Sequence, residues 1–246
     1  MNTYAVEAKN LTKRYGEKTA VDGLNLRVAE GELFALLGVN GAGKTTTIRM
    51  LSCLSKPDGG EALICGRSCQ RESAAVKEII GLSPQETAVA GNLTVRENLT
   101  FMAQVHGLRG RDADARVEEM LDLFRMEKTA NARAKTLSGG WQRKLSIAMA
   151  LISRPRVLFL DEPTLGLDVL ARRELWRAIE ALKGKITILL TTHYMEEAEH
   201  LADRIAVMVD GRLSALGTLA ELEQATGQSG LENVFVAIAE GGAKDE

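Results

Sequence analysis

The stretch GVNGAGKTT at residues 38–46 constrains the fold of this chain more than any other feature. It matches the pattern G-x-x-x-x-G-K-[ST], in which glycines let the backbone wrap around phosphate groups. The apolar segment ELFALLG before it reads as a strand, and GKTTTIRMLSCL after it has helical character. A strand, a glycine-rich phosphate loop and a helix in this order predict an α/β fold. A plain glycine-rich turn is the alternative, and this context disfavours it.

The loop predicts contacts with a ligand that carries phosphates. Lys44 is expected to reach the β- and γ-phosphates, and the hydroxyl of Thr45 is expected to bind Mg²⁺. Backbone N–H groups at the start of the following helix add donors for an anion. The candidate nucleotide-binding residues of the loop are Gly38, Val39, Asn40, Gly41, Ala42, Gly43, Lys44, Thr45 and Thr46.

Apolar segments along the chain predict the strands of a sheet. RVLFL at residues 156–160 and KITILLTTH at residues 185–193 are apolar runs of the kind found in parallel strands that are buried on both faces. The segment at residues 204–217 predicts two short strands in a hairpin around Asp210 and Gly211. Further strands are expected at residues 24–28, 32–38, 61–65 and 78–84.

Two helices with no strand between them predict a helical lobe at residues 90–150. Thr94 and Glu97 have the spacing of a capping box, which favours a helix start. The next helix is amphipathic, because apolar residues recur at i, i+3, i+4 and i+7, namely Val117, Met120, Leu121 and Phe124. Other helices are expected at residues 169–182, at residues 195–203 and after residue 217.

Composition limits the classes of function. The chain has 246 residues and a net charge of −2, so it has no overall basic charge of the kind that binds nucleic acid. No apolar run approaches the length of a membrane span, and the first residues do not read as a signal peptide, so we expect a cytosolic chain. One domain is expected over residues 1–225, followed by a tail at residues 226–246 with a flexible end. The cysteines, which lack metal-site spacing, are expected to be reduced thiols.

Two carboxylates follow the predicted strand in the stretch VLFLDEPT. Open α/β sheets bind their ligands at the carboxyl ends of strands, which is where Asp161 and Glu162 are expected. Asp161 suits the coordination shell of Mg²⁺, and Glu162 suits a general base that polarises an attacking water. The alternative is that the two residues cap the helix that follows them.

His193 and Gln85 also follow predicted strands. His193 is expected at the same edge of the sheet, where it could reach a γ-phosphate, although a lone histidine is more often structural. Gln85 could contact the metal or a water from its loop.

The stretch TLSGGWQRKLSIAMAL at residues 136–151 predicts a second place for an anion. A serine and two glycines before a strong helix leave backbone N–H groups free at the positive end of the helix dipole. One domain would then have two phosphate sites, and local chemistry does not say which phosphate the second one binds.

Taken together, these motifs resemble the nucleotide-binding subunit of ATP-binding-cassette (ABC) transporters over residues 4 to about 216. GVNGAGKTT looks like the family's Walker A motif, VLFLDE like its Walker B motif and LSGG like its signature. The resemblance implies a P-loop NTPase (RecA-like) core with a small antiparallel β lobe and an inserted α-helical lobe. It gives the remaining positions their roles: Tyr15 stacks on adenine, Gln85 is the Q-loop residue, Asp168 belongs to the D-loop and His193 is the switch histidine.

The resemblance also implies that ATP and Mg²⁺ bind between two cassettes packed head to tail. Ser138, Gly139 and Gly140 of one cassette then contact the γ-phosphate of the ATP bound by the other. ATP binding closes such a dimer, and hydrolysis lets it reopen. The second anion site is therefore expected to serve a partner's nucleotide, with the partner being another copy of the chain.

Weaker similarity indicates the branch of the family. The segments around residues 82–108 and 136–151 resemble cassettes that export drugs, antibiotics, lipids or sodium through a separate ABC-2 type permease. The chain is then expected on the inner face of the cell membrane, with the lobe at residues 85–107 as the docking face. A soluble cassette that acts as a clamp or assembly scaffold is the rival hypothesis, and a GTPase or kinase is disfavoured because an NKxD motif is missing.

Two positions depart from the family pattern. Trp141 stands after LSGG where glutamine is common, and Val169 follows Asp168 where proline is common. Neither change touches the phosphate contacts directly. Trp141 falls near helical spacing with Leu145, Ala148 and Ile152, which favours core packing and leaves an interface role open.

Overall fold

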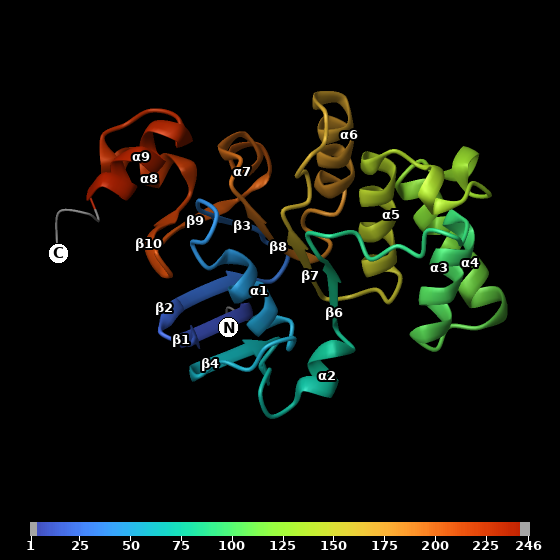
Figure 1. Ribbon diagram of the computed structural model, residues 1–246, viewed down its shortest axis with the longest axis horizontal. Coiled ribbons are helices and arrows are strands. Elements are labelled where there is room, and N and C mark those ends of the chain that lie inside the picture. The colour runs from blue at the N-terminus through green and yellow to red at the C-terminus, as the bar shows by residue number, and fades with distance from the viewer. Residues whose placement is uncertain (1–3, 242–246) are drawn as a thin grey trace.

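Two sheets of different type form the frame of the molecule (Figure 1). The computed structural model describes residues 4–241. An antiparallel sheet has the strand order β2-β1-β4-β5, and a mainly parallel sheet has the order β10-β9-β3-β8-β7-β6. The strands of the antiparallel sheet are β1 (Tyr4–Tyr15), β2 (Lys18–Ala29), β4 (Gly59–Ile64) and β5 (Arg67–Ser68).

The six-stranded sheet confirms the prediction from apolar runs. Every residue of β3, β7 and β8 is buried, as expected for strands covered on both faces. Strand β10 is antiparallel to β9 and completes the predicted hairpin, in which Asp210 and Gly211 have φ of 45° and 82°. The strands are β3 (Leu33–Leu37), β6 (Ile80–Ser83), β7 (Val157–Asp161), β8 (Thr187–Thr192), β9 (Arg204–Val209) and β10 (Arg212–Gly217).

Two hydrophobic cores lie on opposite faces of the six-stranded sheet. Strand β3 shows this, because Phe34 and Leu36 belong to one core while Leu33, Ala35 and Leu37 belong to the other. The first core joins the sheet to the antiparallel sheet and to α1 (Lys44–Leu51). The second lies under helices that include α5 (Gly139–Leu151), α6 (Val169–Glu180) and α7 (Met195–Leu201).

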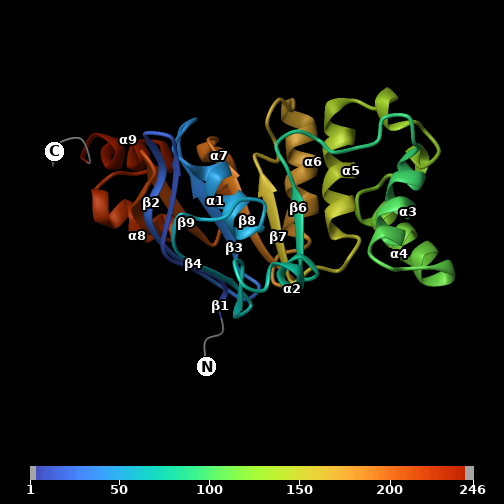
Figure 2. The same ribbon diagram turned by 60° about the horizontal axis from the view of Figure 1, so that its bottom comes forward.

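The predicted helical lobe is present, at the end of the molecule farthest from the antiparallel sheet (Figure 2). Helix α3 (Val95–Val105) begins with the predicted capping box, in which Thr94 Oγ1 accepts from the Glu97 N–H and Glu97 Oε2 accepts from the Thr94 N–H. Helix α4 (Gly110–Leu123) buries the predicted apolar face. Two short 3₁₀ turns, η1 (Glu127–Thr129) and η2 (Ala134–Thr136), lead into α5.

Several elements escaped sequence analysis. Strand β1 was not predicted, because its polar residues and its irregular register with β2 hide the alternation of buried and exposed positions. Helix α2 (Ser73–Lys77) is too short for a periodic signal. The chain ends with α8 (Leu219–Thr226) and α9 (Leu231–Gly241).

Residues 226–241, which were predicted to be part of a tail, include helix α9. Helix α9 buries Leu231, Val234 and Phe235, and these side chains belong to the core beneath α5, α6 and α7. The predicted flexible end falls largely on residues 242–246, which lie outside the described residues. Within residues 4–241, no helix combines the length and the apolar composition that a bilayer span requires.

Candidate functional site

Four loops meet at the carboxyl edge of the parallel sheet. The glycine loop follows β3, His193 follows β8, Glu162 follows β7 and Gln85 lies just past β6. These four strands are neighbours in the order β3-β8-β7-β6 and run parallel, so their carboxyl ends share one edge. This is the edge at which open α/β sheets bind ligands.

The glycine loop takes a backbone shape that excludes larger residues. Gly43 has φ of 104°, and a Cβ there would lie 2.4 Å from the carbonyl oxygen of Ala20. A Cβ on Gly38 would lie 2.5 Å from the carbonyl oxygen of Met208. The glycine loop leads directly into α1, whose first residue is the buried Lys44. Backbone N–H groups of the loop and of the helix start can therefore act together as donors to an anion.

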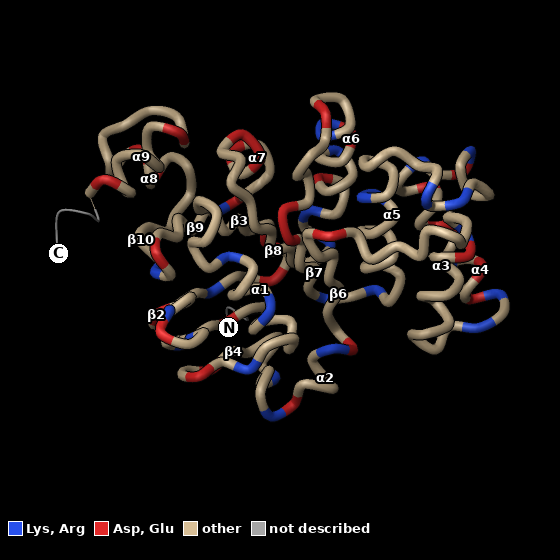
Figure 3. The backbone as a smooth tube through the Cα atoms, in the orientation of Figure 1, with Lys and Arg blue, Asp and Glu red and all other residues tan. Residues whose placement is uncertain are grey.

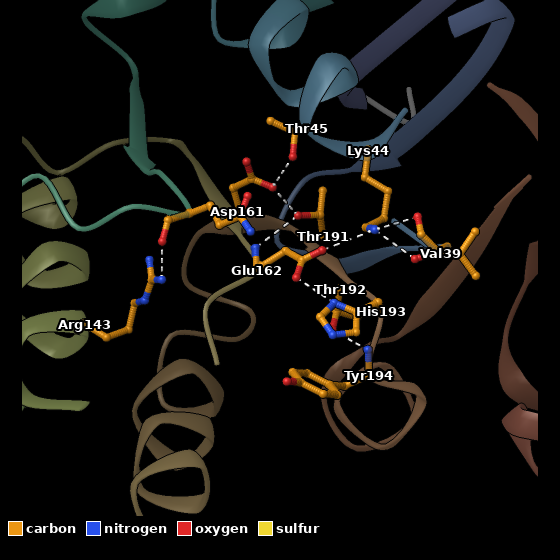
Figure 4. Close-up of polar contacts among 12 residues, drawn as sticks. Val39, Lys44, Thr45, Arg143, Asp161, Glu162, Thr191, Thr192, His193 and Tyr194 are labelled. Carbon is orange, nitrogen blue, oxygen red and sulfur yellow. Dashed lines mark hydrogen bonds and ion pairs between the residues drawn. The ribbon is translucent and has the colours of Figure 1, made fainter. Parts of the chain in front are cut away.

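Lys44, Glu162 and His193 form a connected row of polar groups (Figure 4). Lys44 Nζ donates to the carbonyls of Gly38 and Val39 at 2.8 and 3.2 Å and lies 3.2 Å from Glu162 Oε1. The other carboxylate oxygen, Glu162 Oε2, lies 2.6 Å from His193 Nδ1. Glu162 is thus a buried carboxylate held from both sides, and its φ of 48° is a strained value of the kind that clusters at functional sites.

Asp161 forms a second group of oxygen atoms beside this row. Its Oδ1 accepts hydrogen bonds from Thr45 Oγ1 at 3.1 Å and from Thr191 Oγ1 at 2.6 Å. Adjacent ligands of an octahedral Mg²⁺ are separated by about 3 Å, so Asp161 and Thr45 have the spacing and the chemistry of two such ligands. The donor set therefore fits the predicted magnesium site.

An open pocket of about 430 Å³ lies against these groups. Tyr15 stands at its rim with half of its surface exposed, which leaves the ring available for stacking. In the sequence Tyr15 precedes the glycine loop and Gln85 follows it, yet both residues line the pocket of the folded chain. Of the predicted site residues, the pocket is lined by Tyr15, Asn40, Gly41, Gly43, Lys44, Thr45, Thr46, Gln85 and Glu162, while Ala42 is buried beneath it.

The signature residues lie elsewhere, at the start of α5. Ser138 is the N-cap of this helix, but its hydroxyl makes no capping hydrogen bond, and both Ser138 and Gly139 are exposed. None of Ser138, Gly139 and Gly140 lines the pocket around Lys44. The start of α5 and the glycine loop therefore lie at separate places on the chain, and anion binding at the start of α5 stays a prediction.

Asp168 caps α6. Its Oδ1 accepts from the N–H groups of Leu170 and Ala171, both at 2.9 Å. The alternative hypothesis, that Asp161 and Glu162 cap this helix, is therefore wrong.

Trp141 is half-buried against the same core as Leu145, Ala148 and Ile152. This supports the core-packing interpretation, although one face of the ring is covered by Lys144, whose Nζ lies 4.4 Å from the ring centroid.

Sequence analysis missed three polar residues near the site. Thr191 binds Asp161 and also accepts from the N–H of Glu162 at 3.1 Å, and its only signal was a hydroxyl inside an apolar run. Arg143 and Glu197 are buried charged residues whose partners come from distant segments, so no local pattern reveals them. Acidic residues lie on α7 and at the end of β7, beside the site, as well as on other elements, whereas α8 and α9 carry acidic residues and no Lys or Arg (Figure 3).

Glu197 is a fully buried carboxyl group on α7. Burial raises its pKa, against the opposing effects of the Thr192 and Thr164 hydroxyls, Trp176 and Arg172. Trp176 Nε1 donates to Oε1 at 3.2 Å, whereas Oε2 and the Thr164 hydroxyl that faces it have no partner within hydrogen-bond geometry. Burial therefore shifts this carboxyl toward its protonated form relative to the same group in water.

The variant Glu197→Gln is expected to gain stability relative to wild type as pH rises. Because the pKa of Glu197 is higher in the folded state than in the unfolded state, the free energy of unfolding of wild type falls as pH rises above the unfolded-state pKa of about 4.3. Glutamine cannot ionise, so the variant does not lose this stability. The Tm difference between variant and wild type should increase by roughly 2 °C or more between pH 5 and pH 8. Thermal unfolding across this pH range measures the Tm difference. A difference that stays constant or falls as pH rises would contradict the raised pKa of Glu197.

Comparison with known proteins agrees with this geometry. The family model for ABC transporters matches residues 21–165. The chain is 45% identical over 240 residues to the daunorubicin resistance ATP-binding protein DrrA3 of Streptomyces coeruleorubidus, covering 97% of this chain and 76% of that protein. It is 46% identical to the Nod factor export ATP-binding protein I of Paraburkholderia xenovorans over 220 residues, which are 89% of this chain and 72% of the relative.

A solved structure shows the same fold. The dimeric ATP-binding cassette MJ0796, in a post-hydrolysis state bound to ADP and Pi, has a TM-score of 0.79 and 28% identity, and the match covers 87% of this chain and 98% of that one. The predicted P-loop core with its antiparallel and helical lobes is thereby confirmed. With the family model matching more than half of its length, the chain belongs to the ABC transporter family and is one of its ATP-binding, ATP-hydrolysing subunits.

Proposed function

We propose that the chain powers export of a drug, antibiotic, lipid or ion through a separate ABC-2 type permease. The observation that carries the hydrolytic part is Glu162, a buried carboxylate held between Lys44 and His193 beside the glycine loop. Relatives named for daunorubicin resistance and Nod factor export support the export direction. The chain would act at the inner face of the membrane, since its partner spans the bilayer.

The residues of the pocket have distinct proposed roles. Lys44 and the N–H groups of the glycine loop bind the β- and γ-phosphates, while Tyr15 stacks on the adenine. Thr45, Asp161 and Gln85 hold Mg²⁺, which neutralises charge that develops on the phosphates. Glu162 accepts a proton from the attacking water.

The chain is also proposed to act as a head-to-tail dimer. In this dimer His193, which is held against Glu162, would contact the γ-phosphate, while Ser138, Gly139, Gly140 and Asp168 would face the nucleotide of the second cassette. The start of α5 supports this role, because Ser138 and Gly139 are exposed, no side chain caps the helix there, and neither residue lines the chain's own pocket. The solved cassette MJ0796, which is dimeric and bound to ADP and Pi, supports a dimer.

The rival hypothesis, a soluble cassette that acts as a clamp without transport, predicts the same pocket. It differs in the partner, because a clamp requires no permease. Resemblance to transport subunits over 97% of the chain favours export.

The variant Lys44→Ala should bind ATP roughly 10- to 100-fold more weakly, because it loses charge-assisted hydrogen bonds to two phosphates. Calorimetry measures the affinity. Efflux is then measured in a drug-sensitive host that co-expresses the chain with a candidate ABC-2 type permease, using an antibiotic panel that includes daunorubicin.

Wild type should support efflux and Lys44→Ala should not, while Lys128→Ala, a change on η1, serves as the control. Unchanged nucleotide affinity would contradict the role of Lys44. A chain that hydrolyses ATP but copurifies with no membrane protein would favour the clamp hypothesis.

A further inference from the structure

Arg143 is a buried cation whose hydrogen bonds lead to the loop that carries Gln85. It lies in the second turn of α5 with only 5% of its surface exposed. Its Nη1 donates to the carbonyl of Pro84 at 2.6 Å, and its Nη2 donates to the carbonyl of Gln85. Figure 4 shows the side chain extending from α5 toward the catalytic groups. Within residues 4–241 it forms no ion pair with a carboxylate.

A guanidinium in this position is costly to bury. Burial lowers its pKa, and the negative charge of Asp161 acts against that effect without forming an ion pair with the guanidinium. The planar guanidinium supplies donors in a fixed geometry, so two consecutive carbonyls can be bound by one side chain. Lysine, with a single compact ammonium group, cannot reproduce this pair of bonds with the same geometry. The contact therefore fixes the backbone at Pro84 and Gln85.

The face of α5 that carries Arg143 also packs against strand β6. Ser146 Oγ lies 2.9 Å from Ser83 Oγ in a buried hydrogen bond. One turn further on, a Cβ on Gly81 would lie 2.3 Å from the carbonyl oxygen of Ala150, so helix and strand are in direct backbone contact. Arg143, Ser146 and Ala150 are spaced at i, i+3 and i+7 and form one stripe of the helix. Helix α5 and β6 thus behave as one packed unit.

We propose that Arg143 is a positioning residue that ties the signature end of α5 to Gln85. The proposal rests on the proposed function, in which Gln85 contacts the chain's own magnesium and Ser138 contacts the partner's ATP. Ser138 and Arg143 lie at the same end of α5, so a displacement of Gln85 would also displace the exposed residues Ser138 and Gly139. Each cassette therefore couples the state of its own pocket to the surface that it offers to its partner.

The chain provides a matched control for this proposal. Arg116 is also buried, with 6% of its surface exposed, and it also donates to two consecutive carbonyls, those of Leu151 and Ile152. These carbonyls lie at the opposite end of α5 from the signature. Arg116→Met removes the same pair of carbonyl contacts and, in addition, the ion pair with Glu119. Both variants therefore report the cost to stability, but only Arg143→Met releases Gln85.

The first measurement needs no enzymatic activity. Hydrogen exchange of the hydrogen-bonded amides within residues 85–90 and 138–142, namely those of Ala90 and Gln142, should accelerate at least about tenfold in Arg143→Met, since local opening becomes easier, and should change little in Arg116→Met. Arg143→Lys should fall between Arg143→Met and wild type, because it retains the charge. Equal protection of both segments in wild type and Arg143→Met overturns the proposal, whether or not the chain is an exporter.

The second measurement is a double-mutant cycle with Gln85→Ala on ATP turnover. Arg143→Met alone should lower kcat about tenfold with ATP affinity within about twofold of wild type, the size expected for losing hydrogen bonds to a charged group. In the Gln85→Ala background the same change should cause no further loss.

A full additional loss in that background, or an equal loss in Arg116→Met, shows that Arg143 does not act through Gln85. Unchanged turnover in Gln85→Ala instead overturns the proposed role of Gln85 itself.

Discussion

The variant Glu162→Gln is expected to hydrolyse ATP on the order of 10²- to 10⁴-fold more slowly than wild type while it still binds the nucleotide. Glutamine has the shape of glutamate but cannot accept a proton from water at neutral pH. Its amide oxygen can still accept from Lys44 Nζ, which lies 3.2 Å from Oε1 in wild type. The pocket should therefore keep its form and lose the base.

Charge supports the expectation that binding survives. In wild type the Lys44 ammonium is shared between two carbonyls and the Glu162 carboxylate. Removing the carboxylate leaves more of this positive charge for the phosphates, so ATP affinity should be equal or higher.

Phosphate release measures turnover, and calorimetry measures affinity. Glu118→Gln, an exposed change on α4, is the matched control and should hydrolyse ATP at the wild-type rate. Near-normal turnover in Glu162→Gln would remove Glu162 from its proposed role and leave the base unassigned.

The parts of the fold and of the site that could be predicted from the sequence are those whose signals are local. The glycine loop, the paired carboxylates and the apolar runs are each contained in fewer than ten consecutive residues. The rule that parallel strands share one carboxyl edge then placed His193 beside Glu162, and their atoms lie 2.6 Å apart.

The remaining features depend on contacts between distant segments. Arg143 meets residues that precede it by 58 and 59 positions, and nothing near it in the sequence marks it as buried. Thr191 binds Asp161 across neighbouring strands, and Glu197 is enclosed by Trp176 from another helix. Strand β1 is stabilised by pairing with both β2 and β4 rather than by its own apolar pattern. Such residues become visible only when strand order is known.

The variant Ser138→Arg should keep its own ATP site and fail to form the ATP-dependent dimer. Ser138 is exposed and its hydroxyl makes no capping bond, so an arginine fits on the isolated chain at little cost. In the proposed dimer the same position faces the partner's γ-phosphate, where the larger side chain would block the N–H groups at the start of α5. Dimer affinity should fall at least about 30-fold, because buried contacts to a charged group are lost.

Gel filtration with ATP, in proteins that also carry Glu162→Gln, measures this dimer. Ser214→Arg, an exposed change on β10, is the control and should dimerise as the parent does. A normal ATP-dependent dimer of Ser138→Arg protein would contradict the assignment of the second anion site to a partner.

Mixing two inactive variants gives a sharper form of the same test. Ser138→Arg protein has an intact pocket and a blocked signature, whereas Lys44→Ala protein has a damaged pocket and an intact signature. A head-to-tail pair of the two contains one complete site, made from the pocket of the first and the signature of the second. Hydrolysis should therefore return on mixing, although each protein alone stays inactive. If the second anion site served the chain's own nucleotide, no such complementation could occur, because neither protein would contain both parts.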